Sequence, residues 1–203
     1  MYEETNDFDH ILYQFSCKNG GYFLGNKDEG YEPHCMTVLD ADTVPVVVAP
    51  VTLSGGRYGC NICCEVRCQA EFERPFHMEI LPKNLFRSGL EMIEKEGIEI
   101  RNLSDSHIVK GDAPELMKLC LPGSEAVRLL AGEKKASVRV APNGKDDRRH
   151  TLAVRGEWSV SGSGVFNRQI TEADMGRLVD ICRSLRHALA MYPMEPLDAE
   201  KDS

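Results

Sequence analysis

The segment RYGCNICCEVRCQAEF, residues 57–72, contains four of the eight cysteines of this 203-residue chain. Thiols this close together could coordinate zinc, exchange disulfides or act as nucleophiles. Cys60 and Cys63 have the C-x-x-C spacing of a zinc or redox motif, and Cys64 and Cys68 follow them. Which chemistry is open to the segment depends on the backbone conformation that presents these sulfur atoms.

Alternate residues of this segment form two sets of opposite character. One set is apolar or weakly polar and comprises Tyr58, Cys60, Ile62, Cys64, Val66, Cys68, Ala70 and Phe72. The intervening residues are polar except for Gly59 and Cys63. A period of two with one apolar face predicts a strand half-buried in an antiparallel sheet.

An extended strand keeps the cysteines of one face too far apart for a metal site. Side chains four residues apart are roughly 13 Å apart at a rise of ~3.3 Å per residue. The sulfur atoms of a zinc site lie within about 4 Å of one another. We therefore predict buried thiols, with no metal and no cofactor. Zinc held by Cys60 and Cys63 at a turn is the alternative, although the β-branched Ile62 disfavours a turn and no second C-x-x-C follows.

Cys63 is the one thiol that the alternation places on the polar face. It could act as a nucleophile if His77 or an arginine lowered its pKa. We favour the alternative that a helix or a neighbouring chain covers it, because the sequence places no base beside it. Catalytic and cofactor-binding residues therefore stay unassigned.

Three other segments contain residue types that occur in active sites. SGSGVFN at 161–167 lacks the third glycine of a dinucleotide fingerprint, and no helix follows it at once. SDSH at 104–107 contains Ser, Asp and His, but the members of a catalytic triad converge from separate segments. His34, Cys35 and His77 could meet only through tertiary folding. None of these segments predicts a catalytic site.

Composition and charge exclude some classes of function. The chain is 42% hydrophobic and 28% charged, as in folded soluble proteins, and its net charge is −8. That charge argues against nucleic-acid binding, which depends on neutralising phosphates. The best basic cluster, Lys145, Arg148 and Arg149, is interleaved with Asp146 and Asp147.

The N-terminal sequence MYEETNDFDH is acidic and has no apolar segment, so we expect no signal peptide. The apolar run VPVVVAPV at 44–51 is too short to span a bilayer. We therefore expect a cytoplasmic protein whose cysteines are reduced.

Residues 1–96 are predicted to be β-rich. Residues 1–16 fit either a helix or a strand, whereas 34–53 and 58–72 are strand-like and meet at Gly55–Gly56, a hairpin signal. With a further strand at Phe76–Leu81, they predict an antiparallel meander.

Residues 97–192 predict an α+β part, in which mixed strands and helices are followed by a long amphipathic helix. After a short helix at 89–97, strands are expected at 98–101 and 107–110, and a hairpin at 136–141 and 151–155. Asp112 and Glu115 have capping-box spacing before one short helix, and Ser124 caps the next.

The last helix is marked by a second capping box, Thr171 with Asp174. Its apolar stripe has the spacing of a helix and comprises Met175, Leu178, Val179, Cys182, Leu185 and Leu189. Residues 193–203 are predicted to be a disordered tail. Whether the two parts are one domain or two stays open.

The segment GIEIRNLSDSHIVKGDAPELMKLC, continued through the last helix, is similar to an uncharacterised bacterial domain of unknown function. The resemblance covers about residues 98–191, and HIVKGDAPEL carries most of it. It implies strands and short helices before a long terminal helix, and it brings no catalytic residues. The chain departs from that domain at LSDSH, where an aromatic–acidic pair is usual.

Together these features predict an intracellular, non-enzymatic module that binds a partner protein or a small ligand. The alternative is an enzyme with dispersed catalytic residues, either a thiol enzyme based on Cys63 or a zinc enzyme using Cys60 and Cys63. The sequence does not identify the substrate, the partner or the oligomeric state.

Overall fold

The computed structural model describes residues 7–25, 35–53, 61–83, 97–144, 148–156 and 170–191. Its elements, in chain order, are α1 (Asp7–Lys18), β1 (Tyr22–Gly25), β2 (Cys35–Leu39), β3 (Val46–Leu53), β4 (Asn61–Glu71), β5 (Met78–Pro82), β6 (His107–Gly111), α2 (Pro114–Cys120), α3 (Glu125–Gly132), β7 (Ala136–Pro142), β8 (Arg149–Gly156) and α4 (Glu172–Ala190).

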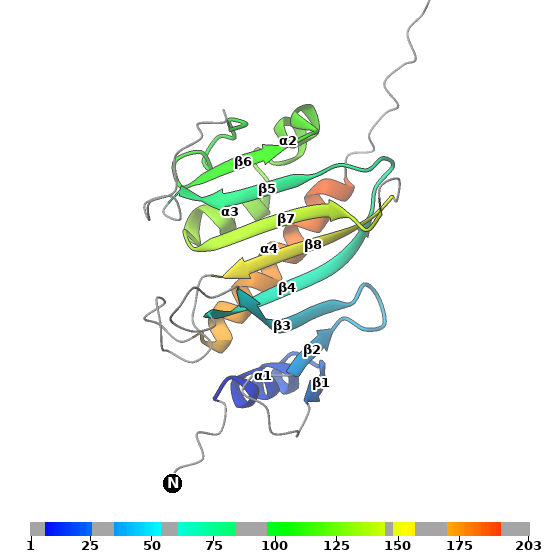
Figure 1. The fold of residues 1–203 in the computed structure, drawn as a ribbon, viewed down its shortest axis with the longest axis vertical. Coiled ribbons are helices and arrows are strands. Elements are labelled where there is room, and N and C mark those ends of the chain that lie inside the picture. The colour runs from blue at the N-terminus through cyan, green and yellow to red at the C-terminus, as the bar shows by residue number, and fades with distance from the viewer. Residues whose placement is uncertain are drawn as a thin grey trace, which may run out of the picture.

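The eight strands form one antiparallel sheet in the order β1-β2-β3-β4-β8-β7-β5-β6 (Figure 1). Strands β2 to β4 form the predicted meander, which β1 extends by one strand, and the α+β class with a long C-terminal helix is confirmed. β5 does not continue the meander, because β8 and β7 lie between it and β4. The boundary expected near residue 96 does not divide the sheet, since β4 pairs with β8 and β5 with β7.

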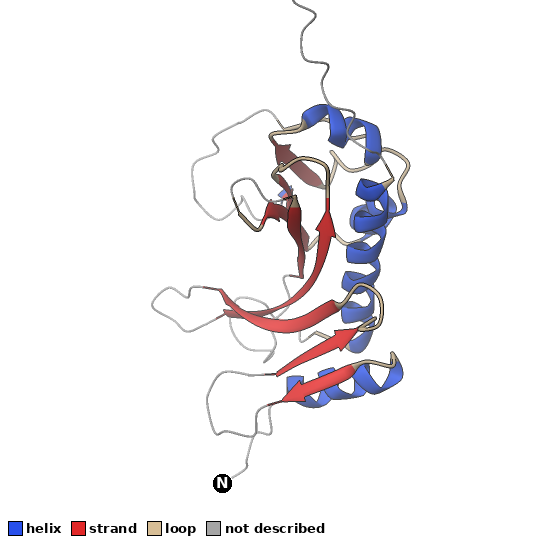
Figure 2. Ribbon diagram, turned by 90° about the vertical axis from the view of Figure 1, so that its right-hand side faces the viewer, coloured by secondary structure: helices blue, strands red, loops and turns tan. Residues whose placement is uncertain are grey.

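The helices all lie on one side of the sheet (Figure 2). α4 packs across β3, β4 and β8, and α1 packs against β1 and β2. Because side chains alternate along a strand, one set from each strand points at these helices and forms the core. The other set points away from them, and we call that side the distal face.

The two most regular sequence signals are confirmed in α4. Its capping box has both of its reciprocal hydrogen bonds, with the Thr171 side chain accepting from the Asp174 amide. Every residue of the predicted apolar stripe is buried, and Leu185 is 0% exposed. The ambiguous N-terminal segment is the helix α1, which buries Phe8, Leu12 and Phe15.

Two local predictions between β5 and α2 are wrong. Residues 98–101 do not form a strand of the ladder: Ile98 makes an isolated bridge to Val109, and a turn follows. Asp112 does not cap α2, whose N-cap residue Ala113 makes no side-chain bond. The Asp112 carboxylate instead accepts a hydrogen bond from the His77 amide, because β6 brings it alongside the start of β5.

The other caps and strands agree with the sequence. Ser124 caps α3 by accepting from the Val127 amide at 3.3 Å, and β7 and β8 form the predicted hairpin. Several predictions lie outside the described residues: the helix at 89–96, the turn at Gly55–Gly56, the segment 161–167, His34, Cys60, Lys145 and the tail 193–203.

Candidate functional site

The cysteine segment is strand β4, as its alternation predicted. Cys64, Val66, Cys68, Ala70 and Phe72 all face the helices and are buried. Burial raises the pKa of the Cys64 thiol, so this sulfur has little thiolate character near neutral pH. The apolar face of the segment therefore belongs to the core.

The polar face of β4 is buried at one end. Cys63 is 1% exposed, which agrees with the favoured prediction that this thiol is covered and is not an accessible nucleophile. Its register partner on β3 is Val51, so an apolar side chain adjoins it directly across the ladder. Glu65, two residues further on, is also 1% exposed. Alternation along a strand identifies the face on which a residue lies, but it does not show whether other side chains cover that residue.

No cluster of three or more His, Cys, Asp or Glu side chains suited to a metal occurs among the residues that the structure describes. The sequence left open that Cys35 and His77 come together in the folded chain, but each of them has a different partner. The Cys35 thiol donates to the Asp9 carboxylate at 2.8 Å, and His77 Nδ1 lies 3.0 Å from the Asp112 carboxylate. A zinc site at Cys60 and Cys63 stays a prediction, because Cys60 lies outside the described residues.

The SDSH segment forms a turn and the start of β6. His107 is buried, and its Nε2 donates to the Ala136 carbonyl at 3.1 Å, which leaves Nδ1 as an acceptor. The Ser106 hydroxyl lies 2.8 Å from that Nδ1, and Ser104 bonds back to Ile100. Burial lowers the pKa of His107, and the Ala136 bond opposes this shift. These bonds are local, and Asp105 is exposed, so the residues do not assemble as a triad.

The distal face brings together side chains that are far apart in the sequence. Strand registers align one residue from each of the eight strands in a continuous row: Tyr22, Val38, Val47, Arg67, Ala153, Arg139, Glu79 and Lys110. Directly opposed residues share a face of the sheet, so the whole row points away from the helices. The row is apolar on β1 to β3, and beyond them it is charged on every strand except β8, where Ala153 stands.

The apolar end of this face is exposed on the edge of the sheet. Tyr22 is 63% exposed, Leu24 is 56% exposed and Met36 is 41% exposed. Leu24 and Met36 are register partners, and Val38 lies beside Tyr22. Neighbouring exposed apolar side chains on one sheet edge are typical of an interaction surface.

The charged end of the face is organised around a buried carboxylate. Glu65 contacts the guanidinium groups of both Arg67 and Arg155, and it lies directly across the ladder from Arg155. The arginine side chains are 51% and 41% exposed, whereas Glu65 is 1% exposed. The carboxylate thus holds two guanidinium groups at the surface.

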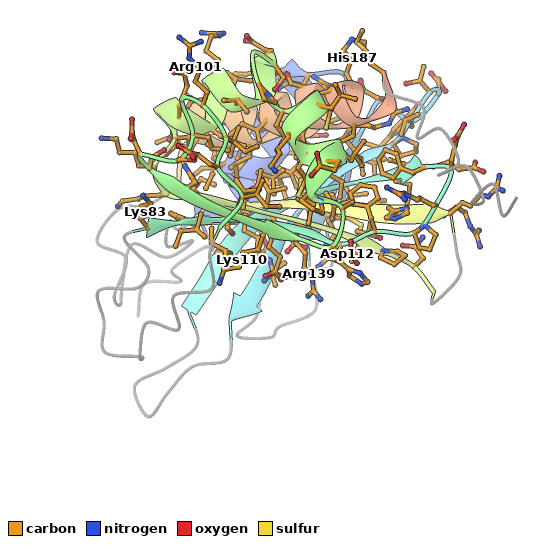
Figure 3. The ribbon with its side chains drawn as sticks, turned by 90° about the horizontal axis from the view of Figure 1, so that it is seen from above. Lys83, Arg101, Lys110, Asp112, Arg139 and His187 are labelled. Carbon is orange, nitrogen blue, oxygen red and sulfur yellow. The ribbon has the colours of Figure 1, made fainter. Side chains whose placement is uncertain are left out.

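Beyond this pair, β5, β6 and β7 enclose a shallow hollow of about 140 Å³. It is lined by His77, Met78, Glu79, Lys110, Gly111, Arg139 and Val140. Lys110, Arg139 and Asp112 lie on the side of the sheet opposite Arg101 and His187 (Figure 3). Burial raises the pKa of Asp112, but hydrogen bonds from the His77 amide and ring outweigh this, so the net shift is downward.

A second hollow, of about 430 Å³, lies on the helix side between the α2–α3 turn and the end of α4. Pro122, Ala188 and Met191 supply its apolar walls, and Arg183 and His187 lie on its rim. The Arg183 guanidinium is already bound to the Asp40 carboxylate at 2.6 Å.

Sequence reasoning placed Glu65 and Arg67 together on the polar side of β4 but did not find Arg155. The available signal was the alternation in RHTLAVRG, residues 149–156, which identifies the face of the strand on which Arg155 lies but not its partner. The pairing depends on the register between β4 and β8, two strands whose sequences are far apart.

Among the described helices, none combines the length and the apolar character that a bilayer crossing requires. No family model matches the chain, and no curated protein sequence matches it. These results are consistent with the resemblance of residues 98–191 to an uncharacterised domain.

Among solved structures, the chain is similar to the crystal structure of the mycobacterial trehalose monomycolate transport factor A, TtfA. The two share 10% sequence identity with a TM-score of 0.48, over 93% of this chain and 98% of that one. Because the TM-score is below 0.5, we base no functional argument on this similarity.

Proposed function

We propose that the protein is a non-enzymatic module that binds an acidic, partly apolar segment of a partner protein on the distal face of its sheet. The observation that supports this proposal best is the row of side chains across the eight strands, which is apolar on β1 to β3 and mostly charged beyond them. A partner segment with apolar side chains at one end and carboxylates at the other would match both halves. We also propose a cytoplasmic location, since the seven described cysteines are thiols and not disulfides.

Charge supports the choice of an acidic partner. The chain as a whole has a net charge of −8. On the distal sides of β4 to β8, however, basic residues outnumber acidic ones: Arg67, Arg139, Arg149, Arg155 and Lys110 against Glu65, Glu71 and Glu79. A basic face on an acidic protein attracts acidic partners and repels the same face of a second copy.

The geometry of the charged half also suits binding more than catalysis. Glu65 is shared between Arg67 and Arg155, and Arg139 lies 3.9 Å from Glu79. Arginines held in place by a carboxylate lose less conformational freedom on binding, which favours bidentate contacts to a partner's carboxylates.

The test is binding of a labelled peptide with leucines in one half and glutamates in the other, followed by fluorescence anisotropy. The matched probe has lysines in place of the glutamates, so it has the same apolar content and the opposite charge. We expect only the acidic peptide to bind, with an affinity that falls as salt is added.

Two pairs of variants locate the binding surface. The double variant Arg139→Glu/Lys110→Glu should bind the acidic peptide roughly tenfold or more weakly. The control variant Arg101→Glu changes a residue on the helix side and should bind it as the unchanged protein does. Leu24→Ser should weaken binding and Leu119→Ser, also exposed but on α2, should not. Equal binding of the two peptides, or equal losses from the two charge reversals, would refute the proposal.

A further inference from the structure

The centre of the core contains two thiols from elements far apart in the sequence. Cys68 on β4 and Cys182 on α4 are separated by 114 positions, yet their sulfur atoms are 3.4 Å apart. The Cys182 thiol donates a hydrogen bond to the Cys68 sulfur. The residues are 3% and 0% exposed. Neither half of the chain contains this pair, which exists only because α4 packs on β4.

We infer that Cys68 and Cys182 form an oxidisable dithiol site, which hydrogen peroxide converts into a disulfide between β4 and α4. A disulfide requires its sulfur atoms at about 2.05 Å, so the pair must contract from its present distance. This inference does not depend on the proposed function, because the pair lies on the helix side of the sheet.

The surroundings assign different roles to the two sulfur atoms. The hydrogen bond from Cys182 lowers the pKa of Cys68, burial opposes that shift, and the Arg186 guanidinium adds to it. The hydrogen bond to Cys68, together with burial, raises the pKa of Cys182. Cys68 is therefore the sulfur that carries thiolate character and Cys182 the sulfur that resolves the intermediate.

The reaction balances with one peroxide for each pair. The Cys68 thiolate attacks one oxygen of hydrogen peroxide, the O–O bond breaks, and water leaves after taking up a proton, so that Cys68 becomes a sulfenic acid. The Cys182 sulfur then attacks the Cys68 sulfur, forming the S–S bond and releasing a second water. In sum, two thiols are oxidised by two electrons, and one peroxide is reduced to two waters.

Burial decides which oxidants can act. A bulky disulfide such as oxidised glutathione would have to form a mixed disulfide at a side chain that is 3% exposed in a close-packed core. Hydrogen peroxide is hardly larger than water, so a much smaller opening of the core lets it reach the pair. We therefore expect the folded protein to be oxidised at this pair by peroxide and to resist oxidised glutathione.

The test uses the full chain carrying Cys17→Ser, because Cys17 is exposed and could link two molecules. After treatment with peroxide, unreacted thiols are alkylated under denaturing conditions, and the digest is mapped without reduction. We expect a peptide that joins Cys68 to Cys182 and is lost on treatment with dithiothreitol. The cross-linked protein should also melt roughly 10 °C higher, since it closes a loop of over a hundred residues.

Variants distinguish this site from general thiol oxidation. Cys182→Ser should stop the reaction at a Cys68 sulfenic acid, which dimedone traps when present during unfolding, and Cys68→Ser should leave Cys182 reduced. Cys64→Ser is the matched control, because it changes a buried thiol on the same side of β4 and should leave the cross-link intact. Absence of the Cys68–Cys182 peptide in the Cys17→Ser protein, while other thiols are oxidised, would overturn the inference.

Discussion

The ion pairs of Glu65 lead to a prediction about which of its partners is costly to remove. The carboxylate is 1% exposed, whereas the side chains of Arg67 and Arg155 are 51% and 41% exposed. If Glu65 is changed to Gln, both guanidinium groups can still be solvated, so the cost should be about 1 kcal/mol of unfolding free energy. If both arginines are changed to Ala, a buried carboxylate keeps no cation, and the cost should be about 3–5 kcal/mol.

The single arginine variants should lie between these values, at about 1–2 kcal/mol each, because one guanidinium group remains in each case. Their sum should fall short of the cost of the double variant. Adding Glu65→Gln to Arg67→Ala/Arg155→Ala should then restore about 2 kcal/mol, since it removes the uncompensated charge.

Urea unfolding of these five proteins near neutral pH, followed by circular dichroism, measures the differences directly. The slope against urea should stay constant, which shows that the same surface unfolds in each variant. If Glu65→Gln costs as much as the double arginine variant, or if the triple variant recovers nothing, then Glu65 is not a buried charge stabilised by the two arginines.

Three further predictions concern the core and its titrating groups. Leu185→Ala removes a side chain that is 0% exposed and should cost roughly 2–5 kcal/mol, whereas Leu119→Ala, at a residue 60% exposed, should hardly change urea unfolding. Burial lowers the pKa of His107 from its ordinary 6.5, so the unfolded chain takes up this proton first. Stability should therefore fall as the pH drops below that value, and His107→Gln should flatten the fall in unfolding measured against pH. A small thiol reagent should modify the exposed Cys17 at once and Cys64 only on unfolding, as peptide mapping will show; rapid labelling of Cys64 would mean that β4 is open.

Several elements could be predicted from the sequence because their signals are local. The alternation of β4 predicted which residues face the core, and the five of them from Cys64 to Phe72 are all buried. The capping box and apolar stripe of α4 predicted its start and its buried side. In each case the pattern repeats with the period of the backbone itself, two for a strand and 3.6 for a helix.

Predictions that depended on what lies next to a residue were less accurate. Cys63 and Glu65 were placed on the polar face of β4, and the structure buries both. Glu65 contacts Arg67 and Arg155, and Arg155 comes from β8, a strand that the alternation of β4 does not specify. Asp112 has the spacing of a helix cap, yet its carboxylate bonds to His77, which the pairing of β5 with β6 brings close.

By itself the sequence determined the conformation of most elements, the acidic character of the chain, and the side of most strands that is apolar. Tertiary structure alone decided that β8 and β7 separate β4 from β5, that Arg155 meets Glu65, and that Cys182 meets Cys68. The physical reason is that periodicity fixes the direction of a side chain relative to its own backbone. The partners of a side chain are determined by strand order, register and helix packing. These depend on the free energy of the whole chain and not on any one segment.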